Sequence, residues 1–285
     1  MMMNEIIKNL KKDVFGTIEG LSIEELVDVI NLTTEHYYNK EPIIDDNTFD
    51  VLVDYLRLKD PKNKVLKQIG TSVKSKDDVE LPYFLGSMDK LRPYVESEVK
   101  KFKKWIKNYK KPYYLSDKLD GISALIVYNF DDTVRMYTRG SAIMGKDITH
   151  LIKYFSNIPS IEDIKSFCKT YKIQGKKCYL AFRGELVMTK DTFEKRWSKD
   201  KKNIRNTVGG LVNSKRVNPK LARDSRFVCY NILDPNTFIK RQYEVIEKLG
   251  LHCVHYRDTD KISMDLLSKY LIKRKEKSKY DIDGV

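Results

Sequence analysis

Cysteine is scarce in this sequence, with four among 285 residues. The four are Cys168, Cys178, Cys229 and Cys253, and no two of them form a Cys-x-x-Cys pair. Structural zinc sites usually need such pairs, so we expect none here. Sparse cysteines are typical of proteins from reducing compartments. The sequence therefore predicts an intracellular protein, in the cytoplasm, whose fold does not depend on disulfides.

Long apolar runs are lacking as well. No stretch reaches the roughly 20 residues that a membrane-spanning helix needs. The opening Met1-Met-Met-Asn-Glu contains no apolar core of the kind found in signal peptides. Internal repeats and low-complexity tracts are also missing, which argues against solenoid architectures. We expect a soluble protein with no membrane partner.

Acidic residues are outnumbered by basic ones. Lys and Arg total 54 and Asp and Glu total 40, which gives a formal net charge of +14. Such an excess favours a polyanionic partner, above all nucleic acid. An AT-rich genome offers a second explanation, because it enriches Lys, Ile, Asn and Tyr together. Hydrophobic residues make up 41% of the chain, which is enough for a sizeable core, so global disorder is not expected.

Residues 1–60 carry helical signals. Ser22, with Glu25 three residues later, forms a capping box. Apolar residues recur after it at helical spacing. An acidic pair ending at Asp46 opens a further helix, and Pro61 ends it. The pattern predicts a helical first domain.

A polar stretch from residue 62 to residue 80 follows, and we place the domain boundary within it. Residues 1–66 are expected to form the helical domain and residues 67–285 a second domain. In the second domain we expect strands at 113–115, 122–128, 134–138, 178–187 and 227–232. We expect helices at 96–109, 148–155, 161–171, 191–197, 205–213, 240–249 and 264–275. Single helices do not alternate regularly with these strands, so the pattern predicts an α+β fold of mainly antiparallel sheets flanked by helices.

The most informative feature is the tetrapeptide Lys118-Leu-Asp-Gly121. Lys118 stands at the end of one strand-like run and Gly121 opens the next, which places a single amine at the mouth of a pocket between two strands. Nucleotidyltransferases keep in this setting the lysine that becomes covalently attached to AMP or GMP. Taken alone, four residues recur by chance and fit a solvated lysine in a strand–turn–strand. The neighbouring motifs decide the interpretation.

Further motifs lie on both sides of the tetrapeptide, at residues 37–50, 85–90, 137–149, 181–188, 203–211, 226–230 and 280–285. With them the chain resembles the NAD-dependent DNA ligases, in which these motifs occur in the same order and at similar spacing. The resemblance runs from about residue 20 to the end of the sequence. It implies a helical domain followed by a covalent nucleotidyltransferase (adenylation) domain.

The resemblance also implies a reaction. Lys118 attacks the α-phosphorus of NAD+ and expels nicotinamide mononucleotide, with Asp120 as the second catalytic residue. An amine attacks only in its neutral form, which desolvation or neighbouring cations favour. Arg139 and a bound Mg²⁺ would supply positive charge and neutralise the transferring phosphoryl group. The lysyl-AMP would then serve to seal nicks in duplex DNA, with the protein acting as a monomer.

Two sets of cofactor-binding residues follow from the same resemblance. Those for the adenylate half of NAD+ are Ser87, Met88, Ser116, Arg139, Glu185 and Tyr230. Those for the nicotinamide mononucleotide half are Tyr37, Tyr38, Asp46, Asn47, Thr48, Phe49 and Asp50. Asp283 matches a late carboxylate near the metal or the phosphates. Ordinary alternatives exist for several of them, such as an outward charge on a half-buried strand for Glu185, core packing for Tyr230 and helix capping for Asp46.

Several positions depart from the family pattern. Ser116 stands where the family has a glutamate that reads the adenine, and Tyr38 replaces a histidine of the nicotinamide site. Phe49 replaces a tyrosine, which keeps the ring and removes one hydrogen-bond donor worth about 1 kcal/mol. Asn213 stands where an arginine would lie near DNA. The sequence ends at Val285, within a strand that the family continues, so we expect it to be the front portion of a longer polypeptide. The altered motifs are typical of a divergent copy, such as a viral one.

Two basic runs carry interleaved aromatic residues, at 100–111 and 193–203. Either run offers phosphate contacts to duplex DNA. For the first we favour a solvated helix face whose aromatic residues turn to the core. For the second, which lies next to motif residues, both interpretations stay open.

Two other functions compete with an NAD-dependent ligase. An ATP- or GTP-using relative, such as an ATP-dependent ligase, RNA ligase or capping enzyme, shares the lysine, but the helical domain with Tyr37, Asp46 and Asp50 argues against it. A degenerate nucleic-acid-binding scaffold would explain the departures from the pattern. The intact Lys118 and Glu185 argue against that scaffold.

Overall fold

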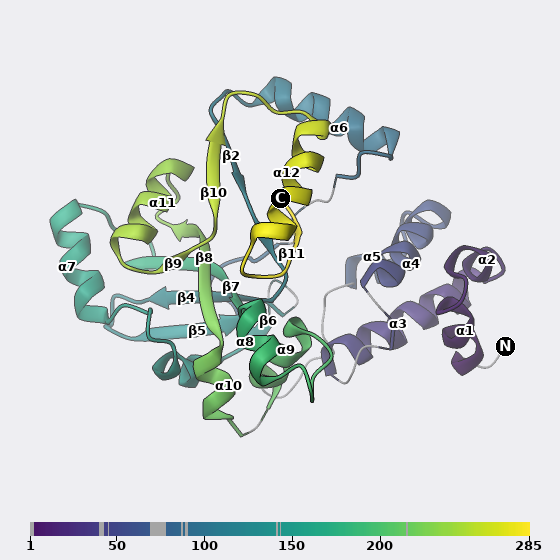
Figure 1. The fold of residues 1–285 in the computed structure, drawn as a ribbon, viewed down its shortest axis with the longest axis horizontal. Coiled ribbons are helices and arrows are strands. Elements are labelled where there is room, and N and C mark those ends of the chain that lie inside the picture. The colour runs from purple at the N-terminus through teal and green to yellow at the C-terminus, as the bar shows by residue number, and fades with distance from the viewer. Residues whose placement is uncertain are drawn as a thin grey trace. The chain divides into compact units, whose positions relative to one another are not determined.

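The structure, a computed structural model, describes residues 3–285 apart from 40–42, 45, 69–77, 87, 89–90, 141, 143 and 215. Contacts group the chain into two compact units. The first is Met1–Glu80 with Gly140–Gly145, and the second is Leu81–Arg139 with Lys146–Val285. The expected boundary between residues 66 and 67 lies just before a stretch outside the described residues. Figure 1 labels most of the helices and strands of both units.

The first unit is mainly helical. Its helices are α1 (Met3–Leu10), α2 (Val14–Glu19), α3 (Ile23–Asn39), α4 (Asp46–Lys59) and α5 (Lys64–Gln68), and one short strand pair joins β1 (Asp78–Glu80) to β6 (Met144–Lys146). The predicted capping box is confirmed. The Glu25 amide donates to the Ser22 hydroxyl at 3.1 Å, and the Ser22 amide donates to the Glu25 carboxylate at 3.0 Å. The apolar faces of the helices meet in a core that includes Leu26, Ile30 and Leu56.

A five-stranded sheet forms the centre of the second unit. The strand order is β5 (Val134–Thr138), β4 (Ile122–Tyr128), β7 (Leu180–Val187), β8 (Arg226–Asp234) and β9 (His252–Cys253). The first three junctions are antiparallel, as predicted, and the pairing of β8 with β9 is parallel. Ala124 and Ile126 belong to the main core, whereas Leu125 and Val127 belong to a smaller cluster. Successive side chains of a strand point to opposite faces, so both faces of β4 are covered.

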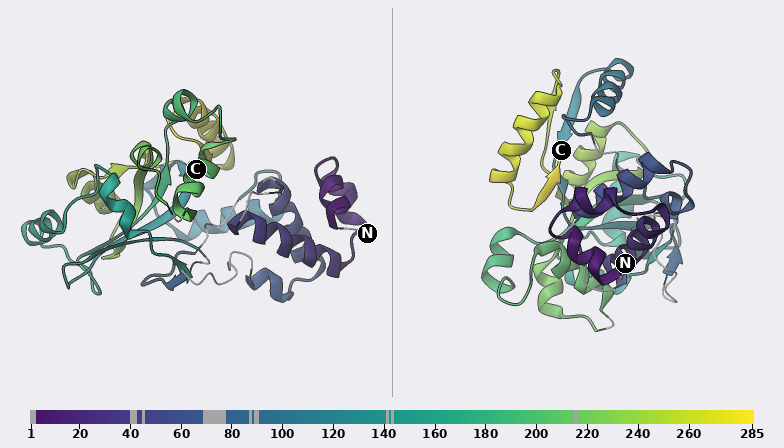
Figure 2. Two further views of the ribbon diagram at one scale, coloured as in Figure 1. Left: turned by 90° about the horizontal axis from the view of Figure 1, so that it is seen from below. Right: turned by 90° about the vertical axis from the view of Figure 1, so that its right-hand side faces the viewer.

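Helices surround this sheet, as two further views show (Figure 2). They are α7 (Ile161–Tyr171), α8 (Lys190–Arg196), α9 (Ile204–Asn213), α10 (Pro219–Asp224) and α11 (Ile239–Lys248). Residues 148–155, which we expected to form an ordinary helix, instead contain a 3-10 helix at Thr149–Tyr154. Ile148 at the start of this segment makes no side-chain capping hydrogen bond, and short 3-10 segments are common connectors.

Two small antiparallel sheets position the predicted nucleophile. β2 (Tyr113–Ser116) pairs with β10 (Tyr256–Thr259), and β3 (Lys118–Leu119) pairs with β11 (Ile282–Gly284). Two further helices, α6 (Glu96–Asn108) and α12 (Met264–Lys277), belong to the same part of the second unit. We did not predict β10, because its middle residues are exposed and it lacks apolar alternation. The α+β class with mainly antiparallel sheets is confirmed.

Candidate active site

Lys118 lies on β3, and the pairing of β3 with β11 sets its surroundings. The Lys118 Nζ atom lies 2.7 Å from Asp283 Oδ1 and 2.6 Å from Asp283 Oδ2. The two side chains are 34% and 36% exposed, so the ammonium group is held by a carboxylate rather than directed into bulk water. The structure thus brings together the predicted nucleophile and the predicted late carboxylate.

Asp120 lies on the turn between β3 and β4. Its amide donates to the Asp281 carbonyl at 2.9 Å, and its carboxylate accepts from Arg205 Nη1 at 2.8 Å. Arg205 stands in the first turn of α9, which Asn203 caps. We predicted the motif at 203–211 without singling out Arg205. Its position inside that motif was the sequence feature that could have identified Arg205 as a site residue.

Glu185 lies on β7, opposite Ser123 of β4. Burial raises the pKa of the Glu185 carboxyl group from 4.5 to about 8, and nearby cations oppose that rise. In order of effect these cations are Arg205, Lys118, Arg183 and Arg139. The Arg139 amide donates to the Ser123 carbonyl at 2.9 Å, which holds the Thr-Arg-Gly turn at this edge of the sheet. The structure therefore brings three predicted site residues close enough to interact at the Glu185 carboxyl group: Lys118, Arg139 and Glu185 itself.

Replacement of Glu185 by glutamine should flatten the pH dependence of stability. A carboxyl group whose pKa is raised by folding keeps its proton in the folded state while the unfolded chain loses it. The folded state therefore loses stability as the pH rises from 4.5 to about 8. Glutamine has no proton to lose, so the stability of Glu185→Gln relative to the wild type should increase across this pH window. Urea denaturation at both ends of the window measures the difference, and an equal difference at both ends would contradict the assignment.

Tyr230 lies on β8, with its hydroxyl 3.3 Å from that of Ser123. Burial raises the pKa of Tyr230 to about 12. The guanidinium carbon of Arg183 lies 5.8 Å from the centre of the Tyr230 ring, and Arg183 Nη2 donates to the Gly86 carbonyl at 2.8 Å. Arg183 precedes Glu185 by two positions on β7, so both side chains lie on the same face. That alternation was the signal that would have identified Arg183.

Ser116 lies on β2 and hydrogen-bonds to the side chain of Tyr243 on α11. Tyr243 in turn stacks on Tyr256 of β10, with ring centres 3.9 Å apart. The residue that replaces the adenine-reading glutamate of the family pattern is therefore already engaged by another side chain.

The structure describes the remaining predicted residues in less detail. Met88 is exposed, and Ser87 lies outside the described residues. Thr48 is buried, and Phe49 packs partly against the core of the first unit. For the others the structure describes the helix but not the side chain: Tyr37 and Tyr38 on α3, and Asp46, Asn47 and Asp50 on α4.

Gly121 opens β4 at a point where only glycine fits. A Cβ atom at this position would lie 2.6 Å from Val187 Cγ1 and 2.9 Å from Glu185 Cγ, and it would collide with the Leu186 carbonyl oxygen. We expect Gly121→Ala to lower the free energy of unfolding by about 1–3 kcal/mol, as overpacking does. It should also displace Glu185 and reduce adenylation.

Gly210→Ala is the matched control for that prediction. Gly210 lies in α9, and a Cβ atom there meets nothing within 4 Å. Alanine favours a helix interior by up to about 1 kcal/mol over glycine, so this variant should be as stable as the wild type or more so. Urea denaturation compares the two. If Gly121→Ala is as stable as Gly210→Ala, the close approach has been misassigned.

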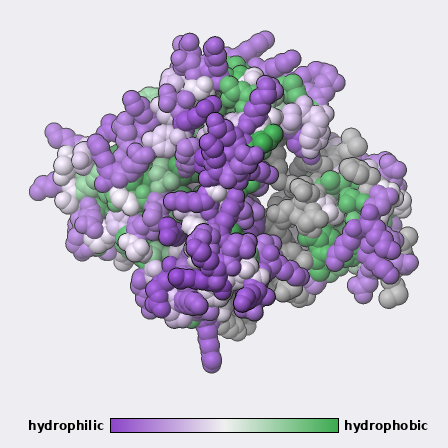
Figure 3. Space-filling model, viewed as in Figure 1, coloured by the Kyte–Doolittle hydropathy of each residue, from purple (hydrophilic) through white to green (hydrophobic). Residues whose placement is uncertain are grey.

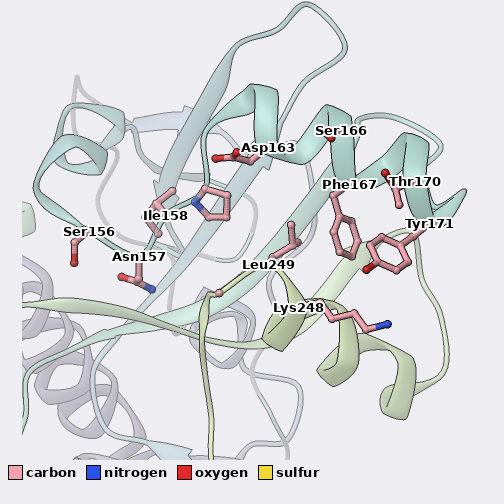
Figure 4. A pocket seen from close by; sticks show the side chains of 12 residues that line it. Ser156, Asn157, Ile158, Asp163, Ser166, Phe167, Thr170, Tyr171, Lys248 and Leu249 are labelled. Carbon is pink, nitrogen blue, oxygen red and sulfur yellow. The ribbon is translucent and has the colours of Figure 1, made fainter.

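A pocket of about 520 Å³ lies elsewhere in the second unit, and none of the predicted site residues lines it (Figure 4). The segment 156–159, α7 and the end of α11 form its walls. Lys248 extends over the ring of Tyr171, with its Nζ atom 4.7 Å from the ring centre. We assign no part of the nucleotide chemistry to this pocket.

The site offers a metal few ligands. Within the described parts of the chain, no cluster of three or more His, Cys, Asp and Glu side chains is suited to hold a metal ion. The Asp120 carboxylate pairs with Arg205, and Asp283 is the carboxylate at Lys118. Mg²⁺ commonly takes only one or two carboxylates from a protein and completes its octahedron with substrate phosphates and water. The residues therefore fit a magnesium ion that is shared with a nucleotide, rather than a protein cage.

None of the described helices is long and apolar enough to cross a lipid bilayer.

Comparison with known proteins identifies the family of the chain. Residues 82–285 match the NAD-dependent DNA ligase adenylation domain. The chain is 35% identical to the DNA ligase of Acanthamoeba polyphaga mimivirus over 99% of its own length and 42% of that relative. It is 30% identical to the protein 052L of Invertebrate iridescent virus 3, over 87% of the chain and 36% of the relative. A bacterial example is the DNA ligase of Treponema pallidum (strain Nichols), at 28% identity over 92% of the chain and 32% of the relative.

The chain thus spans well under half the length of these relatives, which are named DNA ligases in a virus and in a bacterium. The matched region contains Lys118, Arg139 and Glu185, the residues that converge in the second unit. The chain belongs to the NAD-dependent DNA ligase family, and residues 82–285 are its adenylation domain.

Proposed function

We propose that Lys118 is the nucleophile that takes AMP from NAD+, and that the whole protein uses this AMP, as a monomer, to seal nicks in duplex DNA. The observation that carries the proposal is the convergence of Lys118, Arg139 and Arg205 around the Glu185 carboxyl group. Arg183 acts on the same carboxyl group, which makes four cations, and two of the four pair with Asp283 and Asp120. Because the raised pKa keeps Glu185 protonated near neutral pH, positive charge still exceeds negative charge in the site, which suits a phosphorylated ligand.

The chemical step exchanges one bond for another. Lys118 Nζ forms a P–N bond to the α-phosphorus, and the P–O bond to nicotinamide mononucleotide breaks, so that the leaving phosphate carries away the electron pair. Arg139 and Arg205 stabilise the charge that develops on the phosphoryl oxygens. The ammonium group must first lose a proton, and the Asp283 carboxylate, 2.6–2.7 Å from Lys118 Nζ, is the base that accepts it.

The other side chains orient the nucleotide. Glu185 hydrogen-bonds to the ribose, and its raised pKa makes the protonated carboxyl group a donor as well as an acceptor near neutral pH. Tyr230 and Arg183 form an aromatic and cationic wall against which the base packs. Asp283 would hold Mg²⁺ together with the phosphates. When bound, the ion neutralises phosphate charge.

We further propose that residues 1–66 form the domain that binds nicotinamide mononucleotide. The candidate residues Tyr37, Tyr38, Asp46, Asn47, Thr48, Phe49 and Asp50 lie on α3 and α4. Acidic and aromatic side chains suit a cationic pyridinium ring. Deletion of residues 1–66 should abolish the transfer of AMP from NAD+ to Lys118. Lysyl-AMP that has already formed should remain intact in the shortened protein.

The test uses the full chain and intact-mass spectrometry. The protein is first treated with nicotinamide mononucleotide, which removes any AMP carried over from expression, and then incubated with Mg²⁺ and either NAD+ or ATP. We expect a gain of one AMP with NAD+ and none with ATP. A gain from ATP alone would overturn the NAD+ assignment in favour of an ATP-using relative. No gain from either nucleotide would favour a scaffold without activity.

A further inference from the structure

Helix α6 presents a dense row of lysines. Five of its residues, which we call the lysine face, are exposed: Lys100, Lys101, Lys103, Lys104 and Lys107. No acidic residue occurs between residues 99 and 116. The exposed ion pair between Lys100 and Glu96, at 2.8 Å, contributes little. The other four lysines have no ion pair among the salt bridges of the described residues, so the positive charge of the face is left largely uncompensated.

A ladder of aromatic rings runs beside the lysine face. The rings of Phe102 and Trp105 lie parallel, with centres 6.4 Å apart, and Trp105 contacts Tyr109 at 4.9 Å and Tyr113 at 5.7 Å. Phe102 is buried, whereas Trp105 is 42% exposed and Tyr109 is 57% exposed. Our expectation that the aromatic residues of this run turn to the core is correct for Phe102 and wrong for Trp105 and Tyr109.

Helical geometry places the two features side by side. At about 100° per residue, the lysine face covers nearly half of the helix circumference, and Trp105 borders it next to Lys101. From Lys100 to Lys107 the helix rises by about 10 Å. Hydrophilic side chains dominate the upper part of the molecule in Figure 3, where α6 lies in Figure 1.

We propose that α6 is a binding surface for single-stranded nucleic acid. The lysine face contacts successive phosphates, and an unpaired base stacks on the aromatic ladder at its exposed end, formed by Trp105 and Tyr109. Base faces are hidden inside a duplex and open in a single strand, so exposed rings beside lysines favour the single strand. The proposal is independent of the adenylation chemistry, because none of these residues belongs to the candidate active site.

The experiment measures the anisotropy of three labelled ligands bound by the full chain. They are a thymidine oligonucleotide of about 12 nucleotides, within the range of known single-strand sites, an abasic strand of equal length, and a duplex. We expect the thymidine strand to bind tightest. Because stacking is worth about 1–3 kcal/mol per base, it should bind about 5- to 160-fold more tightly than the abasic strand. The joint substitution of Trp105→Ala and Tyr109→Ala should remove that advantage and leave abasic binding unchanged.

The lysine contribution is tested with a charge-matched pair of variants. The first variant combines Lys103→Gln, Lys104→Gln and Lys107→Gln and should weaken the binding of all three ligands. The slope of log affinity against log salt concentration should become shallower by about 2, since each lost single-strand phosphate contact counts about 0.7. The control variant removes the same charge from three exposed positions outside α6: Lys169→Gln, Lys176→Gln and Lys240→Gln. It should change neither the affinity nor its salt dependence.

Three results would overturn the proposal. They are equal affinity for thymidine and abasic strands, preference for the duplex with no effect of the aromatic substitutions, and equal losses in the two lysine variants. Urea denaturation and the gain of AMP from NAD+ confirm that each variant is folded. A failure of α6 to bind the single strand is thereby distinguished from a failure of the proposed adenylation.

Discussion

Lys118→Ala should abolish the gain of AMP from NAD+, and Lys118→Arg should abolish it equally. The amine of Lys118 is the atom that forms the P–N bond, so its removal leaves no alternative nucleophile in place. We expect a loss of about four orders of magnitude or more, as found when nucleophiles are removed from covalent enzymes. Arginine keeps the positive charge beside Asp283 and remains protonated, so it preserves the ion pair and still cannot attack.

The loss in these variants is not attributable to unfolding. Lys118 and Asp283 are each about one-third exposed, and an ion pair with that exposure contributes about 1 kcal/mol at most. Both variants should therefore unfold at nearly the wild-type urea concentration. Lys165→Ala, which breaks a surface ion pair with Asp132 at 2.7 Å, is the matched control and should accept AMP normally. If Lys118→Ala still gains AMP, the assignment of the nucleophile is wrong.

Local patterns in the sequence predicted most of the second unit. The helix expected at 161–171 and the strand expected at 122–128 occur at those residues as α7 and β4. Both carry strong local signals, since Ser160 and Asp163 form a capping box and the strand is apolar at every position except Ser123. Weakly patterned segments were missed, including β10, whose residues are partly or fully exposed.

Pairs of charged side chains could not be predicted, because they join residues that are distant in the sequence. Arg205 and Asp120 are 85 residues apart, and Lys118 and Asp283 are 165 residues apart. Periodicity and capping report only on neighbours along the chain. The resemblance to a family placed Lys118 and Asp283 in one site, and only the fold brought in Arg205 and Arg183.

A buried ion pair next to the nucleophile was not predictable either, and it carries the largest expected effect on stability. Asp117 precedes Lys118, and its carboxylate accepts from Arg274 Nε and Arg274 Nη2, both at 2.8 Å. The side chains are only 2% and 13% exposed. Hydrogen bonding to Asp117 raises the pKa of Arg274. The pair fastens α12 to the segment between β2 and β3.

Arg274→Met should lower the free energy of unfolding by about 3–5 kcal/mol, because it leaves the Asp117 carboxylate buried without a partner. For a unit of this size that corresponds to a fall in melting temperature of about 10 °C. Urea denaturation followed by tryptophan fluorescence is the measurement. Both tryptophans, Trp105 and Trp197, lie in the second unit, so the signal reports the unfolding of that unit. Arg241→Met, at an exposed position on α11, should change stability by no more than about 0.5 kcal/mol.

The double variant Asp117→Leu with Arg274→Met separates the cost of an unpaired charge from the value of the pair. Apolar side chains of similar volume often replace a buried ion pair without loss, so we expect the double variant to recover most of the stability that Arg274→Met loses. The two substitutions should therefore show a strongly non-additive interaction in the double-mutant cycle. Adenylation should fall in Arg274→Met and return in the double variant, because Lys118 follows Asp117 directly and moves with it. If the two single effects simply add, the side chains do not form the buried pair, and α12 is held to β2 and β3 by other contacts.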